Sequence, residues 1–197
     1  MLVLPAFVRK MMLCMDDQVL VVNGTFCARI LIVKGYKHIL HGKKSVLPEL
    51  MLLCSKLLDP VTPEMQCVNV GYMLIHIFDK LAQKISTDLL MAVVQKLYRS
   101  RMPSVVQSLA SLFARLLLKN SKDLLALLTA TSVDNRISLK ILLDRWLLHQ
   151  PLFRGNYTKS VTYTALLQLF TMRDTRVESL MVITYNPSHT NVNSGKP

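Results

Sequence analysis

Apolar residues recur along this chain at the spacing that α-helices require. They lie three or four positions apart, often in adjacent pairs, so one face of each segment is apolar while the other carries polar residues. None of these windows alternates apolar and polar residues as a half-buried strand does. The pattern predicts an all-α fold and is clearest over residues 89–97, 105–117 and 139–147.

Glycines, prolines and small polar residues separate these apolar stretches and mark helix ends. Pro103 sits where a helix begins, a position that tolerates proline. The Asn23-Gly24 and Lys34-Gly35 pairs indicate turns or helix C-caps. These signals predict helices at residues 3–14, 24–34, 45–58, 64–83, 87–99, 103–119, 122–131, 135–149 and 157–171.

Several residue types recur at a step of 40 residues. A period near 40 with two helices per unit is typical of HEAT repeats, which stack into a right-handed α-solenoid with a continuous core. We therefore predict a solenoid segment of about four to five helix pairs over residues 1–185, truncated at both ends, and a disordered tail over 186–197. The step joins Cys14 to Cys54, Cys27 to Cys67, and Met11 to Met51 and Met91.

The charge balance favours acidic partners. The chain has 197 residues, of which 24 are Lys or Arg and 12 are Asp or Glu, so its formal net charge is +12. The basic residues are spread along the chain, which makes a specific nucleic-acid role the weaker interpretation. Charged or polar residues interrupt the apolar windows, so we expect no membrane span. The apolar N-terminal stretch precedes its basic residues, the reverse of a secretory signal, and an intracellular chain without disulfides is expected.

Four cysteines raise the question of a metal site. Structural zinc sites bring their ligands in pairs two to four residues apart, whereas these cysteines are 13 apart within each pair and lie in apolar segments. The favoured interpretation is that Cys14, Cys27, Cys54 and Cys67 are buried free thiols that act as small hydrophobic residues. We predict that they bind no zinc.

Other polar groups also have structural explanations. His38 and His41 are three residues apart, but no acid or thiol ligand accompanies them at helical spacing, so a solvated helix end is favoured over a metal site. The Asp16-Asp17 pair falls in a predicted turn, where it more often caps a helix than performs acid–base chemistry. The chain contains no nucleophile elbow, P-loop or H-E-x-x-H motif, so neither an enzyme nor a cofactor is predicted.

A basic and aromatic cluster lies at the junction of two predicted helices. Lys96, Tyr98, Arg99 and Arg101 could stack on and neutralise a nucleic acid. The favoured alternative places the tyrosine at the edge of the core and leaves the cations in solvent, because no second aromatic residue completes a stacking platform.

The order of several segments resembles the C-terminal region of the importin-β (karyopherin) family, most closely its importin-nine branch. The resemblance spans roughly residues 10–185 and rests on the shared order of short motifs rather than on any one of them. The residues that carry it are Leu58-Asp59-Pro60, Val70-Gly71, Val106-Gln107-Ser108-Leu109, Phe113-Ala114, Trp146, Leu152-Phe153, Gly155, Tyr157 and Ala165-Leu166.

This resemblance implies a nuclear transport receptor that shuttles between cytoplasm and nucleus. Such receptors bind protein cargo, Ran-GTP and nucleoporins, and the importin-nine branch is associated with histones and ribosomal proteins. Its Ran site lies in an N-terminal half that has no counterpart here, so we expect no Ran-GTP binding by this chain alone. The family pattern also implies that helices near 24–34, 64–83, 103–119 and 135–149 face the cargo.

The positive charge departs from what the resemblance implies. Receptors for basic cargo are typically acidic, whereas a net charge of +12 would repel a histone. The leading hypothesis is therefore a cargo-binding solenoid segment for protein import, with the cargo undetermined. The alternative is a basic helical-repeat scaffold that binds nucleic acid or an acidic protein, and its binding would weaken steeply with added salt.

Overall fold

The chain is built almost entirely of helices, as predicted. The computed structural model describes residues 3–41, 46–80 and 86–180; of Val3 and residues 38–41 it describes the backbone alone. The long helices are α1 (Val3–Leu13), α2 (Gln18–His41), α3 (Leu47–Leu58), α4 (Val70–Lys80), α5 (Thr87–Arg99), α6 (Pro103–Ala130), α7 (Ser138–His149) and α8 (Asn156–Thr171). The short elements are η1 (Glu64–Cys67), β1 (Ser132–Val133), β2 (Arg136–Ile137), η2 (Gln150–Leu152) and α9 (Thr175–Glu178).

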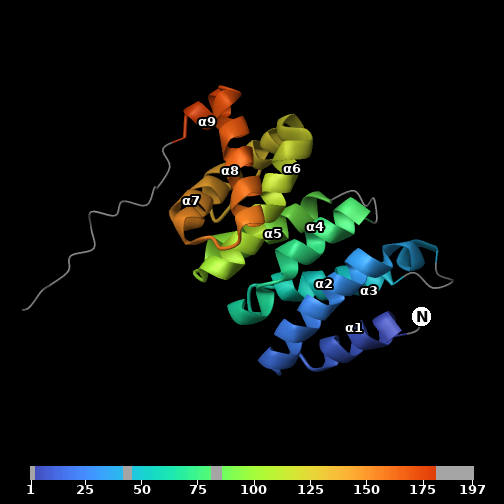
Figure 1. Cartoon of the computed structure of the whole chain (residues 1–197). Coiled ribbons are helices and arrows are strands. Elements are labelled where there is room, and N and C mark those ends of the chain that lie inside the picture. The colour runs from blue at the N-terminus through green and yellow to red at the C-terminus, as the bar shows by residue number, and fades with distance from the viewer. Residues whose placement is uncertain (1–2, 42–45, 81–85, 181–197) are drawn as a thin grey trace, which may run out of the picture.

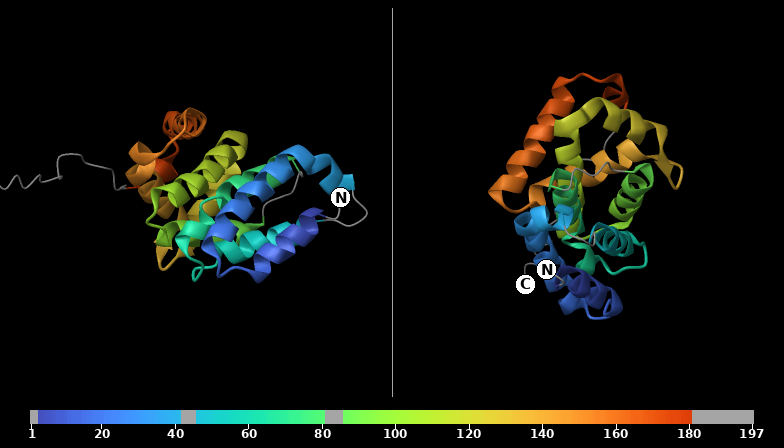
Figure 2. Two further views of the ribbon diagram at one scale, coloured as in Figure 1. Left: turned by 60° about the horizontal axis from the view of Figure 1, so that its bottom comes forward. Right: turned by 90° about the vertical axis from the view of Figure 1, so that its right-hand side faces the viewer.

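The helices form two parallel layers. In the odd layer, α1 contacts α3, α3 contacts α5, and α5 contacts α7; in the even layer, α2, α4, α6 and α8 contact one another in the same order. Helix pairs such as α1–α2 and α6–α7 join the two layers, and the pairs follow one another from α1 at one end to α8 at the other (Figure 1, Figure 2). This is the stacking of an all-α helical-repeat solenoid.

Helix α2 passes through both glycine pairs that predicted turns, so the expected helix at 24–34 was too short. Gly24 is buried where α2 crosses α1, and a Cβ atom there would overlap the Met11 sulfur. The glycine therefore permits close helix packing rather than a turn. Asp17 supplies the N-cap of this helix, because its Oδ1 accepts a hydrogen bond of 2.9 Å from the Leu20 amide.

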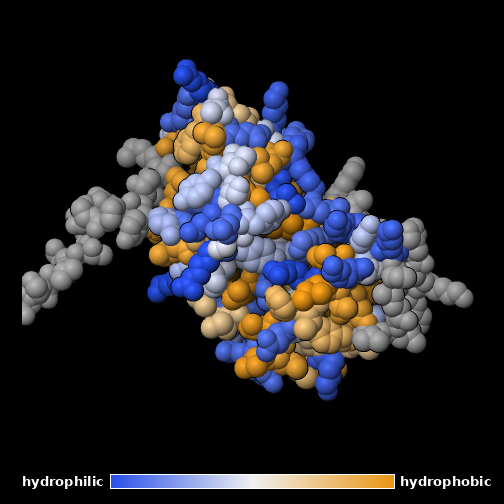
Figure 3. Space-filling view, in the orientation of Figure 1, coloured by the Kyte–Doolittle hydropathy of each residue, from blue (hydrophilic) through white to orange (hydrophobic). Residues whose placement is uncertain are grey.

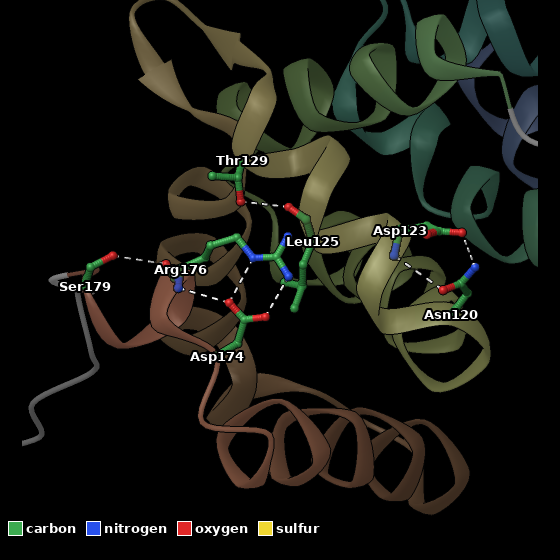
Figure 4. A network of polar contacts seen from close by, with 7 residues as sticks. All are labelled: Asn120, Asp123, Leu125, Thr129, Asp174, Arg176 and Ser179. Atoms are coloured by element: carbon green, nitrogen blue, oxygen red, sulfur yellow. Dashed lines mark hydrogen bonds and ion pairs between the residues drawn. The ribbon is translucent and has the colours of Figure 1, made fainter.

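Helix α6 contains the break that was predicted near residue 120. Asn120 has φ −152° and ψ 79°, outside the helical region, although the helix continues on both sides of it. Its side chain forms a 2.5 Å hydrogen bond to Asp123 Oδ2, and its Oδ1 accepts from the Asp123 amide, as an N-cap does (Figure 4). The segments predicted at 103–119 and 122–131 are thus two halves of one kinked helix.

A short hairpin replaces the start of the helix predicted at 135–149. Strands β1 and β2 pair antiparallel, with Ser132 opposite Ile137. Asp134 and Asn135 between them have φ values of 48° and 62°, which suits a type I′ turn and the short side chains that tolerate it. Helix α7 therefore begins only at Ser138.

The 40-residue step holds between α3 and α5 but not elsewhere. Met51 and Met91 are the fifth residue of their helices, and both are partly buried against the core. Cys14, by contrast, lies beyond the end of α1. Cys27 is an exposed residue within α2, whereas Cys67 ends the short helix η1 before α4. The second cysteine pair therefore does not mark equivalent positions.

Side chains of one repeat bond to the backbone of the next at the odd-layer turns. Lys96 is buried on α5, and its Nζ donates to the carbonyl oxygens of Asp59 and Thr62 at 2.8 and 2.7 Å. In return, the Glu64 carboxylate accepts from the amides of Arg101 and Met102 at the start of α6. The 59–64 turn and the next repeat are therefore joined twice, once by a side chain of the next repeat and once by a side chain of the turn.

Similar bonds join the remaining repeats. Each is made by an amide or guanidinium side chain, and each links residues 47 to 51 positions apart. The side-chain amide of Gln107 makes two bonds to the backbone of Arg154: Nε2 donates to the Arg154 carbonyl oxygen, and Oε1 accepts from the Arg154 amide. The bonds of this kind run from Gln66 to Met15 O, from Asn69 to Val22 O, from Gln107 to Arg154 O and from Arg145 to Tyr98 O.

Helices α4 and α6 approach each other closely at Gly71. Its amide donates a 3.0 Å hydrogen bond to Ser108 Oγ on α6. A Cβ atom at this position would overlap the Ser108 carbonyl group, which is backbone and cannot rotate away. Both residues belong to the motifs that carry the family resemblance, and the structure brings those motifs into direct contact.

The described part of the chain ends with α9. Asp174 caps it through the Arg176 amide and holds the Arg176 guanidinium with two further bonds of 2.9 and 2.6 Å (Figure 4). The pKa of Asp174 falls to about 2, chiefly because of the side-chain hydrogen bond from Arg176. The predicted solenoid boundary at residue 185 and the tail at 186–197 lie outside the described residues.

Candidate functional site

The four cysteines occupy different environments, so the prediction that all are buried was half wrong. Cys54 and Cys67 are buried, Cys14 is intermediate and Cys27 is exposed, and all four are free thiols. Cys67 Sγ donates to Leu57 O at 2.9 Å. Within residues 3–41, 46–80 and 86–180, no three His, Cys, Asp or Glu residues form a group that could hold a metal ion. The prediction that the thiols bind no zinc remains to be tested by metal analysis.

Burial makes the two inner thiols poor nucleophiles. It raises the pKa of Cys54 to about 12. It also raises the pKa of Cys67, although the nearby Lys96 opposes this effect. Because the thiolate is the reactive species, iodoacetamide at pH 8 should modify exposed Cys27 quickly and Cys54 at least about 10²-fold more slowly. Mass spectrometry of alkylated peptides measures both rates; equal rates in the folded protein, with all four thiols reacting in urea, would contradict this assignment.

The basic and aromatic cluster near residues 96–101 does not form a binding platform. Lys96 points into the protein toward turn carbonyls, so the expectation that it stays in solvent was wrong. Tyr98 is half-buried with the Arg136 guanidinium 5.6 Å from its ring centroid. Arg99 and Arg101 are exposed, as predicted. The cluster therefore serves mainly to connect repeats.

The two remaining polar pairs have separate outcomes. Asp17 caps α2, which confirms the structural interpretation of the Asp16-Asp17 pair. His38 and His41 fall within α2, but their side chains lie outside the described residues. Their predicted place at a solvated helix end stays a prediction.

A row of cationic and aromatic side chains crosses the surface of the even layer. Arg29 on α2 lies with its guanidinium carbon 5.0 Å from the Phe26 ring centroid and 5.4 Å from that of Tyr72 on α4. The Tyr72 hydroxyl accepts a 2.9 Å hydrogen bond from Gln107 on α6. One end of the row thus spans three helices through contacts that fix the Arg29 side chain in place.

The other end of the row is organised around one carboxylate. Asp79 on α4 forms ion pairs with Arg115 and Lys119 on α6, the first at 3.3 Å. His76, one turn earlier on α4, has its pKa lowered first by burial and then by the charge of Arg29, while Asp79 opposes the shift. Lys80 and Arg115 also lower the pKa of His76 by their charge, but burial has the largest effect.

Lys80 completes the group and lies over an aromatic ring. Its Nζ is 5.5 Å from the Tyr36 ring centroid on α2. We call Arg29, Tyr72, Asp79, Lys80, Arg115 and Lys119 the basic row. It holds four cations and one carboxylate, and each cation is at least partly exposed.

The face of α2 beyond the row is apolar and open. Val19, Phe26 and Ile30 are 71%, 45% and 42% exposed. Among the described residues, Gln18–Lys37 is the one segment long and apolar enough to cross a membrane, contrary to the prediction of none. Length and composition are weak evidence for a span, and this segment packs on α1 and α4 as a repeat helix does. In Figure 3 hydrophobic residues gather in the lower half of the view, where Figure 1 places α1 to α3.

The curated proteins that are similar to this chain include two importins. Importin-9 of Drosophila melanogaster is 28% identical over 162 residues, which cover 79% of this chain and 16% of the relative. Importin subunit beta-5 of Saccharomyces cerevisiae is 25% identical over 139 residues, covering 69% of this chain and 14% of the relative. The chain is similar to proteins of the importin-β family. The similarity covers only about one-sixth of each relative, and a scan against models of known protein families found no match.

The importin-like stack corrects one expectation about which helices share a surface. The predicted cargo-facing set included residues 135–149, but α7 packs beside α5 in the odd layer. The helix that continues the row of α2, α4 and α6 is α8. The error arose because the predicted set counted residues 122–131 as a separate helix of the odd layer, whereas they extend α6 beyond the kink at Asn120, and α7 takes the odd-layer place instead.

Sequence reasoning missed the basic row entirely. Its members come from three helices. Within the sequence of any one helix, each charged member looks like an ordinary solvent-exposed residue. One signal could have found part of it: Arg29, Tyr72 and Arg115 follow one another at steps of 43 residues. That step differs from the 40-residue step that the cysteines suggested.

Proposed function

We propose that this chain acts as a helical-repeat segment of a nuclear transport receptor and binds protein partners through the surface of its even layer. The observation that carries the proposal is the similarity to two importins over most of the chain, together with two continuous layers of stacked helices. Such a stack offers a long surface of polar side chains on rigid helices, which suits recognition of a protein rather than catalysis.

The positive charge of this chain argues against basic cargo at this surface. Histones and ribosomal proteins are basic, and a basic partner would be repelled by the basic row and by the net charge of +12. We therefore expect such cargo, if the whole receptor carries it, to bind at other repeats. Shuttling between cytoplasm and nucleus, nucleoporin contacts and the absence of Ran-GTP binding by this chain alone are parts of the same proposal.

The test is a transport assay in permeabilised cells. The chain is fused to a fluorescent reporter too large to pass the nuclear pore by diffusion, and the reporter alone is the control. We expect the fusion to accumulate at the nuclear rim or inside the nucleus, and the reporter to stay outside. Equal distribution of the two would refute the proposal.

A second candidate function is a basic scaffold that binds nucleic acid. The row of cations favours it, because phosphate contacts by Lys and Arg supply most non-specific affinity. Fluorescence anisotropy with an oligonucleotide tests it across salt concentrations. A steep loss of affinity with salt, together with no activity in the transport assay, would favour this candidate over the first.

A further inference from the structure

The basic row has cations that no carboxylate of the described chain neutralises. Asp79 already pairs with Arg115 and Lys119, whereas no described carboxylate lies within ion-pair distance of Arg29 or Lys80. Both are instead held over aromatic rings. The row thus keeps positive charge available at fixed positions on the surface.

The aromatic contacts prepare Arg29 to bind an anion. Its guanidinium contacts both the Phe26 and the Tyr72 ring, so less side-chain freedom remains to be lost on binding. The planar group still has donors at its edge, which match the two oxygens of a carboxylate. Arg115 shows that an arginine of the row can bind a carboxylate, because its guanidinium contacts one oxygen of Asp79 at 3.3 Å.

Apolar surface borders the row on one side. Phe26 and Ile30 on α2 remain 45% and 42% exposed next to Arg29. A partner that covered this area would need apolar side chains near its carboxylates. An acidic protein segment with interspersed apolar residues has this composition.

Single-stranded nucleic acid fits the row less well. Such ligands bind through aromatic rings on which bases stack. Arg29 already occupies one face of both Phe26 and Tyr72, and the Tyr72 hydroxyl is fixed by Gln107. The Asp79 carboxylate would also repel a phosphate backbone that followed the row, whereas a peptide can place its own carboxylates away from it.

We propose that the basic row binds an acidic segment of a partner protein, with Arg29 and Lys80 as its main anion contacts. This deepens the proposed function, because it names the chemical class that one part of the even layer recognises. It implies that the partner reaches this surface through electrostatic attraction that salt weakens.

The experiment uses the full chain and three fluorescent probes. The first is a Glu-rich peptide that carries a Leu and a Phe, the second has every Glu replaced by Gln, and the third is an oligo-dT strand. We expect the Glu peptide to bind and the Gln peptide to bind at least about tenfold more weakly. The Arg29→Gln/Lys80→Gln variant should weaken the Glu peptide by a similar factor.

A matched variant controls for charge alone. Lys10→Gln/Lys56→Gln removes two exposed cations from α1 and α3 of the odd layer, and it should change Glu-peptide affinity less than about twofold. Circular dichroism confirms that both variants fold. Equal losses in the two variants, or tighter binding of oligo-dT than of the Glu peptide, would overturn the inference. Neither result depends on nuclear accumulation, so a failure here is distinguishable from failure of the transport assay.

Discussion

Replacing Gly71 by alanine should destabilise the fold by about 3 kcal/mol, despite the higher helix propensity of alanine. The new methyl group would meet the Ser108 carbonyl, so α4 and α6 would have to move apart there. Separation would also stretch the 3.0 Å bond from the Gly71 amide to Ser108 Oγ. Urea denaturation followed by circular dichroism measures the loss as a lower transition midpoint.

Two other glycines serve as controls for Gly71→Ala. At Gly24 the added methyl group would meet Met11 Sδ and Cγ, a side chain that is buried but more flexible than backbone, so we expect a smaller loss of about 1–2 kcal/mol. At Gly155 no atom lies within 4 Å, but φ is +84°, and the substitution should cost about 1 kcal/mol from backbone strain alone. A Gly71→Ala effect no larger than these would show that the helices are not in tight contact there.

Replacing Trp146 by alanine should destabilise the fold by about 4 kcal/mol. The indole is completely buried on α7 and is among the largest side chains of the core. Its Nε1 donates a 2.6 Å bond to Gln150 Oε1, and Gln150 Nε2 donates in turn to Thr162 on α8. Truncation would leave both a cavity and a buried amide oxygen without its donor.

The Trp146→Phe variant separates these two effects. Phenylalanine fills most of the space but cannot donate to Gln150, so we expect a loss of about 1–2 kcal/mol. Thermal unfolding followed by circular dichroism suits both variants, since the chain has a single tryptophan and its fluorescence would be lost. If Trp146→Phe were as damaging as Trp146→Ala, the hydrogen bond rather than the packing would dominate.

Helix positions could be predicted where local signals agreed. The range 87–99 was correct at both ends, because the apolar stripe is regular and Ser86 Oγ caps the helix by accepting from the Leu89 amide. The range 157–171 missed the observed start by one residue. At Gly24 the local signal misled, since a glycine needed for close packing looks the same in sequence as one needed for a turn.

The candidate site could not be predicted in the same way. Charge composition suggested an acidic partner, which stays a prediction, and it could not show which cations lack an ion-pair partner. Lys96 and Lys80 look alike in sequence, yet the first is buried against turn carbonyls and the second lies over the Tyr36 ring. That difference depends on how repeats stack, which no window within one helix contains.

The bonds between repeats have a consequence for how this sequence can change over evolution. Lys96, Gln107 and Arg145 each bond to main-chain atoms of a neighbouring repeat. Every amino acid supplies those atoms, apart from the missing amide proton of proline, so substitutions on the receiving side leave the joints intact. In each of these bonds only the residue that supplies the side chain must be kept. Related sequences can therefore diverge widely in sequence identity while their repeats keep the same arrangement.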